Sequence, residues 1–205
     1  CKRNIDTLQI IYRSIMDKAD LLKRIMPHLS WPASLGAPIY DTFSLSSVVV
    51  IIHFTKHSPH VLLTKRSANL RSHSGEISFP GGRYTKEDET LLNTAIREIG
   101  EEIGIKLTTD DILGCLKVVK TLTSNFLIVP FVSVLEHIKQ PIPFADEVEA
   151  VLDIPLISLL STMRPDTEHV SIDELYKFNY DSTLIWGATA RILKQLNEFI
   201  LQETR

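Results

Sequence analysis

Three glutamates near the middle of the chain form its densest cluster of chemically active side chains. Glu98, Glu101 and Glu102 lie within the stretch REIGEEIGI, residues 97–105. Successive residues of an α-helix are rotated by about 100°, so these carboxylates fall within about 100° of one another on one stripe. Apolar side chains occupy the stripe beside it, namely Leu92, Ala95, Ile96, Ile99 and Ile103. One face of this helix can therefore be buried while its neighbour carries the charge.

The spacing of the three glutamates predicts a bound cation. Exposed carboxylates at such separations repel one another by a few tenths of a kcal/mol per pair, and a positive ion among them removes that cost. Ligands that are all oxygen atoms favour a hard divalent ion, Mg²⁺ or Mn²⁺, over zinc. A solvated acidic helix face is the alternative, and the short pattern alone leaves both interpretations open.

The residues that flank the acidic stretch predict how it is positioned. Phe79, Pro80, Gly81 and Gly82 supply an apolar strand end, a fixed φ and two residues that tolerate positive φ. The helix must then begin between Lys86 and Thr90, where Asp88 or Thr90 can cap it. Strand, glycine turn, loop and acidic helix are thus expected to form one structural unit.

This unit resembles the Nudix box, whose pattern is GX₅EX₇REUXEEXGU with U aliphatic. Residues 97–105 match its second half at every specified position. The first half differs, since Asp88 stands at the sixth position after Gly82, where the pattern has glutamate, and Arg97 comes one residue late. This variant looks like the one carried by the coenzyme A branch of the family.

A second resemblance lies upstream. Residues 62–67 (LLTKRS), followed by Arg71, Gly75 and residues 79–82, resemble the signature of coenzyme A pyrophosphatases among Nudix enzymes. The resemblance extends more loosely through residues 146–156 and 185–187, and covers most of the chain beyond about residue 45. It implies cleavage of coenzyme A within its pyrophosphate, giving 4′-phosphopantetheine and adenosine 3′,5′-bisphosphate.

The resemblance also implies roles for the acidic residues. Glu98, Glu101 and Glu102 would bind Mg²⁺ or Mn²⁺, which would neutralise the pyrophosphate and lower the pKa of an attacking water. Arg97 is expected to orient a carboxylate of its own helix, Glu101, and Asp88 to brace the loop. Glu147 is the candidate for a further metal ligand or general base, with a plain surface glutamate as the alternative.

Basic residues before the helix are the candidates for phosphate binding. Arg66, Arg71 and His73 lie in a polar segment, with Lys65 beside them, and guanidinium groups match phosphate oxygens. Gly81 and Gly82 complete the predicted substrate site. An adenine slot is expected as well, and its aromatic candidates are Tyr84, Phe126, Phe131 and Trp186, although most aromatic residues belong to the core.

The overall composition bounds the architecture. A chain of 205 residues with 44% hydrophobic and 23% charged residues fits one soluble domain with a sizeable core. Residues 1–44 are predicted to be an N-terminal extension, with an amphipathic helix over 5–29 broken near 17–20, then a connector. Residues 45–205 are predicted to be the Nudix hydrolase domain, an α/β/α sandwich with a mixed sheet between helices, as the resemblance implies.

Several elements of that domain can be predicted from residue type. A buried strand is expected over 46–54 with a hairpin partner over 61–65, followed later by strands over 113–122 and 126–135. Residues 146–160 are expected to combine a short strand with a helical turn. A hairpin between 170–172 and 176–180 and a helix over 183–202 that packs on the sheet complete the prediction.

Composition also limits partners and location. Cys1 and Cys115 cannot form a disulfide framework, which favours a reducing compartment, and Cys115 is expected to be buried. The sequence contains no run of eighteen apolar residues, so we expect no membrane span. The net charge of −3 argues against nonspecific nucleic-acid binding. We expect a cytoplasmic protein that acts on a small molecule. Location in an organelle is the alternative, because the chain starts at Cys and not at Met. A homodimer is compatible with the sequence.

Two other functions remain in view. One is a broader pyrophosphatase acting on ADP-ribose, a nicotinamide dinucleotide or an oxidised nucleotide. The other is an inactive Nudix-fold binding module, against which the retention of Glu98, Glu101 and Glu102 speaks.

Overall fold

The computed structural model describes residues 16–31, 43–68, 75–122, 124–144, 146–168 and 175–201. The helices are α2 (Lys18–Ile25), α3 (Leu91–Ile103), α4 (Leu156–Ser161) and α5 (Gly187–Ile200), with single 3₁₀ turns at Met26–His28, Lys86–Asp88 and Thr109–Asp111. The strands are β1 (Ser44–Thr55), β2 (Ser58–Arg66), β3 (Ile77–Ser78), β4 (Gly81–Arg83), β5 (Gly114–Cys115), β6 (Val119–Lys120), β7 (Phe126–Leu135), β8 (Val148–Pro155), β9 (Arg164–Pro165), β10 (Tyr176–Tyr180) and β11 (Thr183–Ile185). Within the described ranges, no helix combines the length and the hydropathy that crossing a lipid bilayer requires.

The centre of the main sheet is β1, the strand predicted from the run of β-branched residues over 46–54. It pairs in parallel with β7 and antiparallel with β2, β2 pairs antiparallel with β8, and the short β4 lies against the start of β1. Eight consecutive residues of β1 are buried, as expected for a central strand covered on both faces. The sheet is therefore mixed, and the predicted hairpin of β1 and β2 is confirmed.

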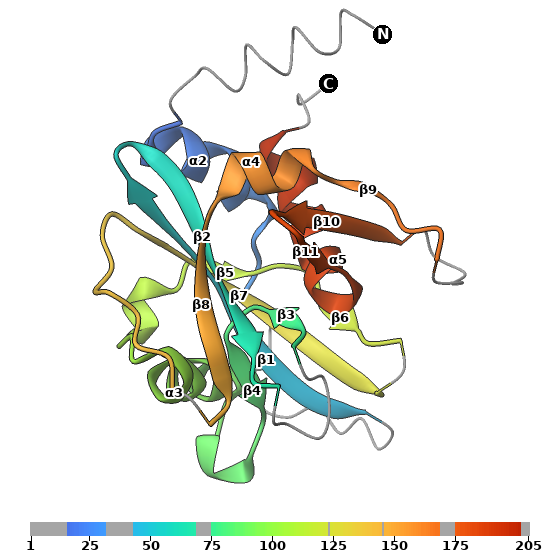
Figure 1. The fold of residues 1–205 in the computed structure, drawn as a ribbon. Helices are drawn as coiled ribbons and strands as arrows, with labels where there is room; N and C mark the ends of the chain where they lie inside the picture. The colour runs from blue at the N-terminus through green and yellow to red at the C-terminus, as the bar shows by residue number, and fades with distance from the viewer. Residues whose placement is uncertain are drawn as a thin grey trace, which may run out of the picture.

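Alternating side chains of β1 point into two separate cores. Val49 and Ile51 pack with Ile99 of α3, whereas Val50 and Ile52 pack with residues of α2, α4 and α5. Figure 1 shows α3 on one side of the sheet and the other three helices on the opposite side. The predicted α/β/α sandwich is confirmed.

The N-terminal helix contributes to one of these cores. Asp17 caps α2 by accepting a hydrogen bond from the N–H of Asp20 at 2.8 Å, so α2 begins within the stretch, residues 17–20, where the sequence predicts a break. Leu21 and Ile25 are fully buried in the cluster that contains α5. Residues 1–15 and most of the connector lie outside the described residues, so the domain division at residue 44 stays a prediction.

Two predicted elements differ in the structure, and a third lies partly outside the described residues. The strand expected over 113–122 is split into β5 and β6 by a bulge. Cys115 pairs with Phe131 and Val119 with Ile128, so this segment has one more residue than the part of β7 that it faces. The helix expected from residue 183 begins at Gly187, since residues 183–185 form β11 and pair with β10. Residues 170–172 lie outside the described residues, and β10 pairs with β9 and β11.

Candidate active site

A glycine turn brings the strand before the acidic helix against β1. Gly81 has φ of +148°, and a Cβ there would overlap the carbonyl oxygen of Ser47. The N–H of Gly81 donates to Oε2 of Glu102 at 3.0 Å. The turn therefore fixes one carboxylate of the predicted site directly.

Thr90 and Asp88, the two residues predicted as possible caps, have different roles at the start of α3. Thr90 is the N-cap and accepts from the N–H of Asn93 at 3.1 Å. Asp88 is buried and accepts from Thr94 at 2.9 Å and from Nε and Nη2 of Arg97 at 2.7 and 3.0 Å. The bond from Arg97 holds the pKa of Asp88 well below its ordinary value. Asp88 thus ties the loop to the helix.

Arg97 links this loop to two of the glutamates. Its Nη2 lies 2.9 Å from Oε1 of Glu98, and its Nη1 donates to Oε2 of Glu101 at 2.7 Å, the contact expected from the sequence. The bond to Asp88 is the main reason that the pKa of Arg97 lies above its ordinary value. In these contacts each glutamate uses one carboxylate oxygen, and its other oxygen does not take part in them.

Glu102 is the buried carboxylate of the group. The pKa of Glu102 is raised to about 7, mainly by burial; the charges of Glu98 and Glu147 add to this rise, and the N–H of Gly81 and the charge of Arg66 oppose it. Its ionised form therefore lacks enough positive charge around it. An added cation would supply that charge.

Gly82 gives the carboxylate of Glu98 its place. A Cβ at Gly82 would overlap the carboxyl group of Glu98, so only glycine leaves that space. Burial raises the pKa of Glu98, and the charge of Arg97 opposes the shift. Both glycines predicted as site residues thus lie directly against the glutamates of α3.

Glu147 approaches the same carboxylates from another element. It is exposed and immediately precedes β8, and its charge raises the pKa of both Glu98 and Glu102. Its carbonyl oxygen accepts from the N–H of Ser67 at 2.9 Å, which ties it to the end of β2. The structure therefore brings Glu147 near the acidic helix, and its role remains a prediction.

Arg66 is the predicted phosphate-binding residue that the structure describes beside Glu102. Its charge lowers the pKa of Glu102, and its Nε is buried without a hydrogen-bond partner in the described part of the chain. An unpaired buried donor is costly unless an acceptor meets it. Arg71 and His73 lie outside the described residues. Lys65 donates to Glu149 at 2.6 Å, so its charge is already paired.

The aromatic candidates for an adenine slot separate by burial. Phe131 is fully buried in the core on the α3 side, which removes it from the candidates. Phe126 lies beneath the guanidinium of Arg83, at 5.9 Å from its ring centre. Phe144, which the sequence analysis did not single out, is 58% exposed, and its N–H donates to the carbonyl of Glu102 at 3.0 Å. The signal that could have found it is the apolar run PIPF at residues 141–144.

The donors gathered here fit a hard divalent cation. They are carboxylate oxygens, and the raised pKa values of Glu98 and Glu102 favour an added positive charge. The ligand oxygens of Glu98, Glu101 and Glu102 do not all come within 4.8 Å of one another. Arg97 draws the first two toward itself, so ion binding requires their side chains to turn inward.

Comparisons with known proteins identify the family of this chain. The family model of the NUDIX domain matches residues 44–172. An uncharacterized Nudix hydrolase NudL of Pectobacterium atrosepticum is 32% identical over 172 residues, covering 82% of this chain and 88% of the relative. A NudL of Yersinia pestis is 33% identical over 157 residues, covering 73% and 77%.

A solved structure shares the fold. The crystal structure of a MutT/nudix family protein from Enterococcus faecalis aligns with a TM-score of 0.56 at 15% identity, covering 94% of this chain and 71% of that chain. The match to the family model and the identity with the curated relatives show that the chain belongs to the Nudix family and is a hydrolase of phosphoanhydride bonds.

Proposed function

We propose that the protein hydrolyses the pyrophosphate bond of coenzyme A or its derivatives, giving 4′-phosphopantetheine and adenosine 3′,5′-bisphosphate. The observation that carries the proposal is the unpaired, buried Nε of Arg66 beside Glu102. Arg66 belongs to the upstream stretch LLTKRS, which resembles the coenzyme A pyrophosphatase signature. An arginine there can bind a phosphate oxygen of the substrate while the acidic helix holds the cation.

In this proposal Glu98, Glu101 and Glu102 hold Mg²⁺ or Mn²⁺. The ion, when bound, neutralises charge on the pyrophosphate and lowers the pKa of an attacking water. Arg97 and Asp88 keep the acidic helix and the glycine turn in register through their mutual hydrogen bonds. Glu147, which is exposed and whose charge acts on Glu98 and Glu102, would accept the proton that the water loses.

A substrate panel with product analysis tests the proposal. Coenzyme A, acetyl-coenzyme A, 3′-dephospho-coenzyme A and ADP-ribose are incubated with the protein, with and without Mn²⁺, and kcat/KM is compared. We expect coenzyme A and acetyl-coenzyme A, the two substrates with a 3′-phosphate, to react fastest and to release adenosine 3′,5′-bisphosphate. Faster cleavage of ADP-ribose, with little turnover of coenzyme A, would point to the broader nucleoside-diphosphate pyrophosphatase.

A variant of Arg66 tests the residue that carries the proposal. Arg66→Lys keeps the positive charge but loses the planar fork, so kcat/KM for coenzyme A is expected to fall by about 10-fold or more. Arg164→Lys is the matched control, because Arg164 is exposed in β9. Equal kcat/KM in the two variants would remove Arg66 from substrate binding.

A further inference from the structure

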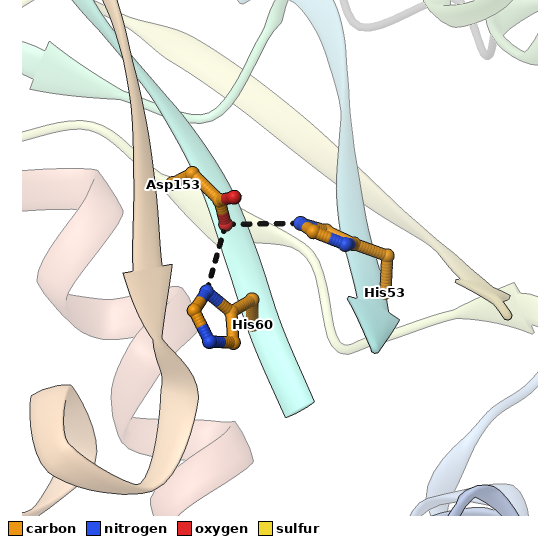
Figure 2. A group of neighbouring side chains, drawn as sticks. All are labelled: His53, His60 and Asp153. Atoms are coloured by element: carbon orange, nitrogen blue, oxygen red, sulfur yellow. Dashed lines mark hydrogen bonds and ion pairs between the residues drawn. The ribbon is translucent and has the colours of Figure 1, made fainter. Parts of the chain in front are cut away.

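A second cluster of metal-ligating side chains lies at the far end of the sheet from the acidic helix. His53 of β1 is paired in register with His60 of β2, and Asp153 lies on the neighbouring β8 opposite Leu62. The start of β1, by contrast, pairs with β4 at the glycine turn. Figure 2 shows the three side chains converging across these strands.

The ligand atoms of this cluster are already close together. Oδ1 of Asp153 lies 2.9 Å from Nε2 of His53 and 3.0 Å from Nδ1 of His60, and all three atoms lie within 4.8 Å of one another. Ligands about 2.0–2.1 Å from a tetrahedral ion lie about 3.3 Å apart. Small side-chain rotations would therefore open the cluster enough to admit an ion.

Burial gives the cluster a closed wall and an open side. The side chain of His53 is 5% exposed and that of His60 is 16% exposed, whereas that of Asp153 is 48% exposed. The buried imidazole of His53 and the half-buried imidazole of His60 lie within the sheet, and an ion can enter from solvent past Asp153. The three ligands also leave a coordination position for water on that side.

The ligand types select the ion. Two imidazole nitrogens and one carboxylate oxygen suit zinc and similar transition ions, whereas Mg²⁺ prefers oxygen ligands. Binding would replace the two ring protons that now face Asp153, because a histidine ligand must be deprotonated at the coordinating nitrogen. This preference is opposite to that of the glutamates on α3.

We propose that His53, His60 and Asp153 form a binding site for a zinc-type divalent ion, separate from the carboxylate site. The ion would join three neighbouring strands, β1, β2 and β8. It would raise the free energy of unfolding, and tighter binding of the ion would raise it more, since the unfolded chain does not hold the three ligands together.

Cobalt(II) provides a direct test, because its visible absorption reports nitrogen-containing, low-coordination sites. The full chain is stripped of metal and titrated with Co²⁺ in excess Mg²⁺, which occupies the carboxylate site. The proposal expects visible bands that saturate at one equivalent and disappear when Zn²⁺ is added. It also expects Zn²⁺ to raise the melting temperature under the same conditions.

Variants assign the signal to these residues. His60→Ala and Asp153→Asn are expected to weaken Co²⁺ binding by about 100-fold or more, since even outer-shell changes cost about 10- to 100-fold. Both are expected to retain the hydrolase activity, and Asp153→Asn, at a half-exposed position, guards against failure of His60→Ala to fold. His57→Ala is the matched control, because His57 is exposed on the turn of the same hairpin.

The proposal is overturned if the wild-type protein gives no visible bands with Co²⁺. It is also overturned if folded His60→Ala and Asp153→Asn bind Co²⁺ as tightly as His57→Ala. The cluster would then be a hydrogen-bonded group of side chains without an ion.

Discussion

Arg97 is the residue on which the geometry of the acidic helix depends. It contacts Asp88, Glu98 and Glu101 at once, at distances between 2.7 and 3.0 Å. Without a cation, this arginine is the positive charge that keeps neighbouring carboxylates from repelling one another. The arrangement leaves Glu102, which Arg97 does not contact in any described bond, to respond most strongly to pH and to metal.

Glu102 predicts a pH dependence of metal binding. Its pKa of about 7 means that protons compete with the cation below neutral pH. Affinity for Mn²⁺ should therefore fall by about tenfold for each pH unit below about 7, which is about 1.4 kcal/mol per unit. Calorimetric titration of the protein with Mn²⁺ at several pH values measures this slope. A Glu102→Gln control should bind weakly with a flatter dependence, and an equally flat wild-type curve would contradict the assignment.

Asp88 predicts a separate effect of pH, on the stability of the folded chain. Its folded pKa is depressed by Arg97, so its contribution is complete above the ordinary value of 3.8 and is lost as pH falls through the lower folded value. Asp88→Asn should lower the free energy of unfolding at neutral pH by about 2–3 kcal/mol. Breaking a fully buried ion pair costs about 3–5 kcal/mol, and the cost is smaller here because Arg97 is partly exposed.

Chemical denaturation of Asp88→Asn beside Asp110→Asn, an exposed control, checks this value. Equal stability of the two variants would show that the bridge from Asp88 to Arg97 does not hold the loop.

Some residue-level contacts could be predicted from sequence and others could not. The contact between Arg97 and Glu101 follows from a four-residue helical spacing. The pairing of Lys65 with Glu149 and the His53, His60 and Asp153 cluster depend on strands far apart in the chain, whose register no local pattern specifies. Phe131 was offered as a binding candidate because an aromatic residue type does not reveal burial.

At the scale of elements, the glycine turn and α3 act as one rigid unit. The turn supplies a backbone N–H to Glu102 and leaves space for Glu98, and the start of α3 is tied back to the loop by Asp88. This coupling makes the position of the carboxylates sensitive to one added methyl group.

Gly82→Ala is expected to displace the carboxylate of Glu98 and reduce kcat by about 100-fold, since a misplacement near 1 Å can cost that much. Gly100→Ala on α3 is the matched control, because a Cβ there meets no atom within 4 Å. That control should keep its activity and gain about 0.5–1 kcal/mol in stability. Steady-state kinetics with thermal denaturation compares them, and comparable activity would argue against the close packing of Gly82 on Glu98.

The elements that were predicted correctly carry strong local signals. The β-branched run over 46–54 and the strand–turn–helix unit over 79–103 are examples. The split of β5 and β6 and the pairing of β11 with β10 were missed, because a bulge and a tight turn at Asp181, where φ is +50°, depend on tertiary pairing.

For the whole molecule, the helix at the N-terminal end of the described chain is part of one core. Leu21→Ala should lower the free energy of unfolding by about 2–5 kcal/mol, because Leu21 is fully buried against the cluster that includes α5. Met26→Ala, at a 44% exposed position, is the control and should change it little. Urea unfolding that leaves both variants equally stable would support a separable N-terminal extension.

Hydrolysis of coenzyme A in ¹⁸O-labelled water by the wild-type protein and by Glu102→Gln tests whether a cation held by the acidic helix drives cleavage of the pyrophosphate. We expect Mn²⁺-dependent release of adenosine 3′,5′-bisphosphate and 4′-phosphopantetheine, with one of them carrying ¹⁸O. Glu102→Gln should be slower by about 1,000-fold while remaining folded, since an ion contributes several kcal/mol, and Glu149→Gln should match the wild type. Metal-independent cleavage, or near-normal turnover by Glu102→Gln, would contradict it.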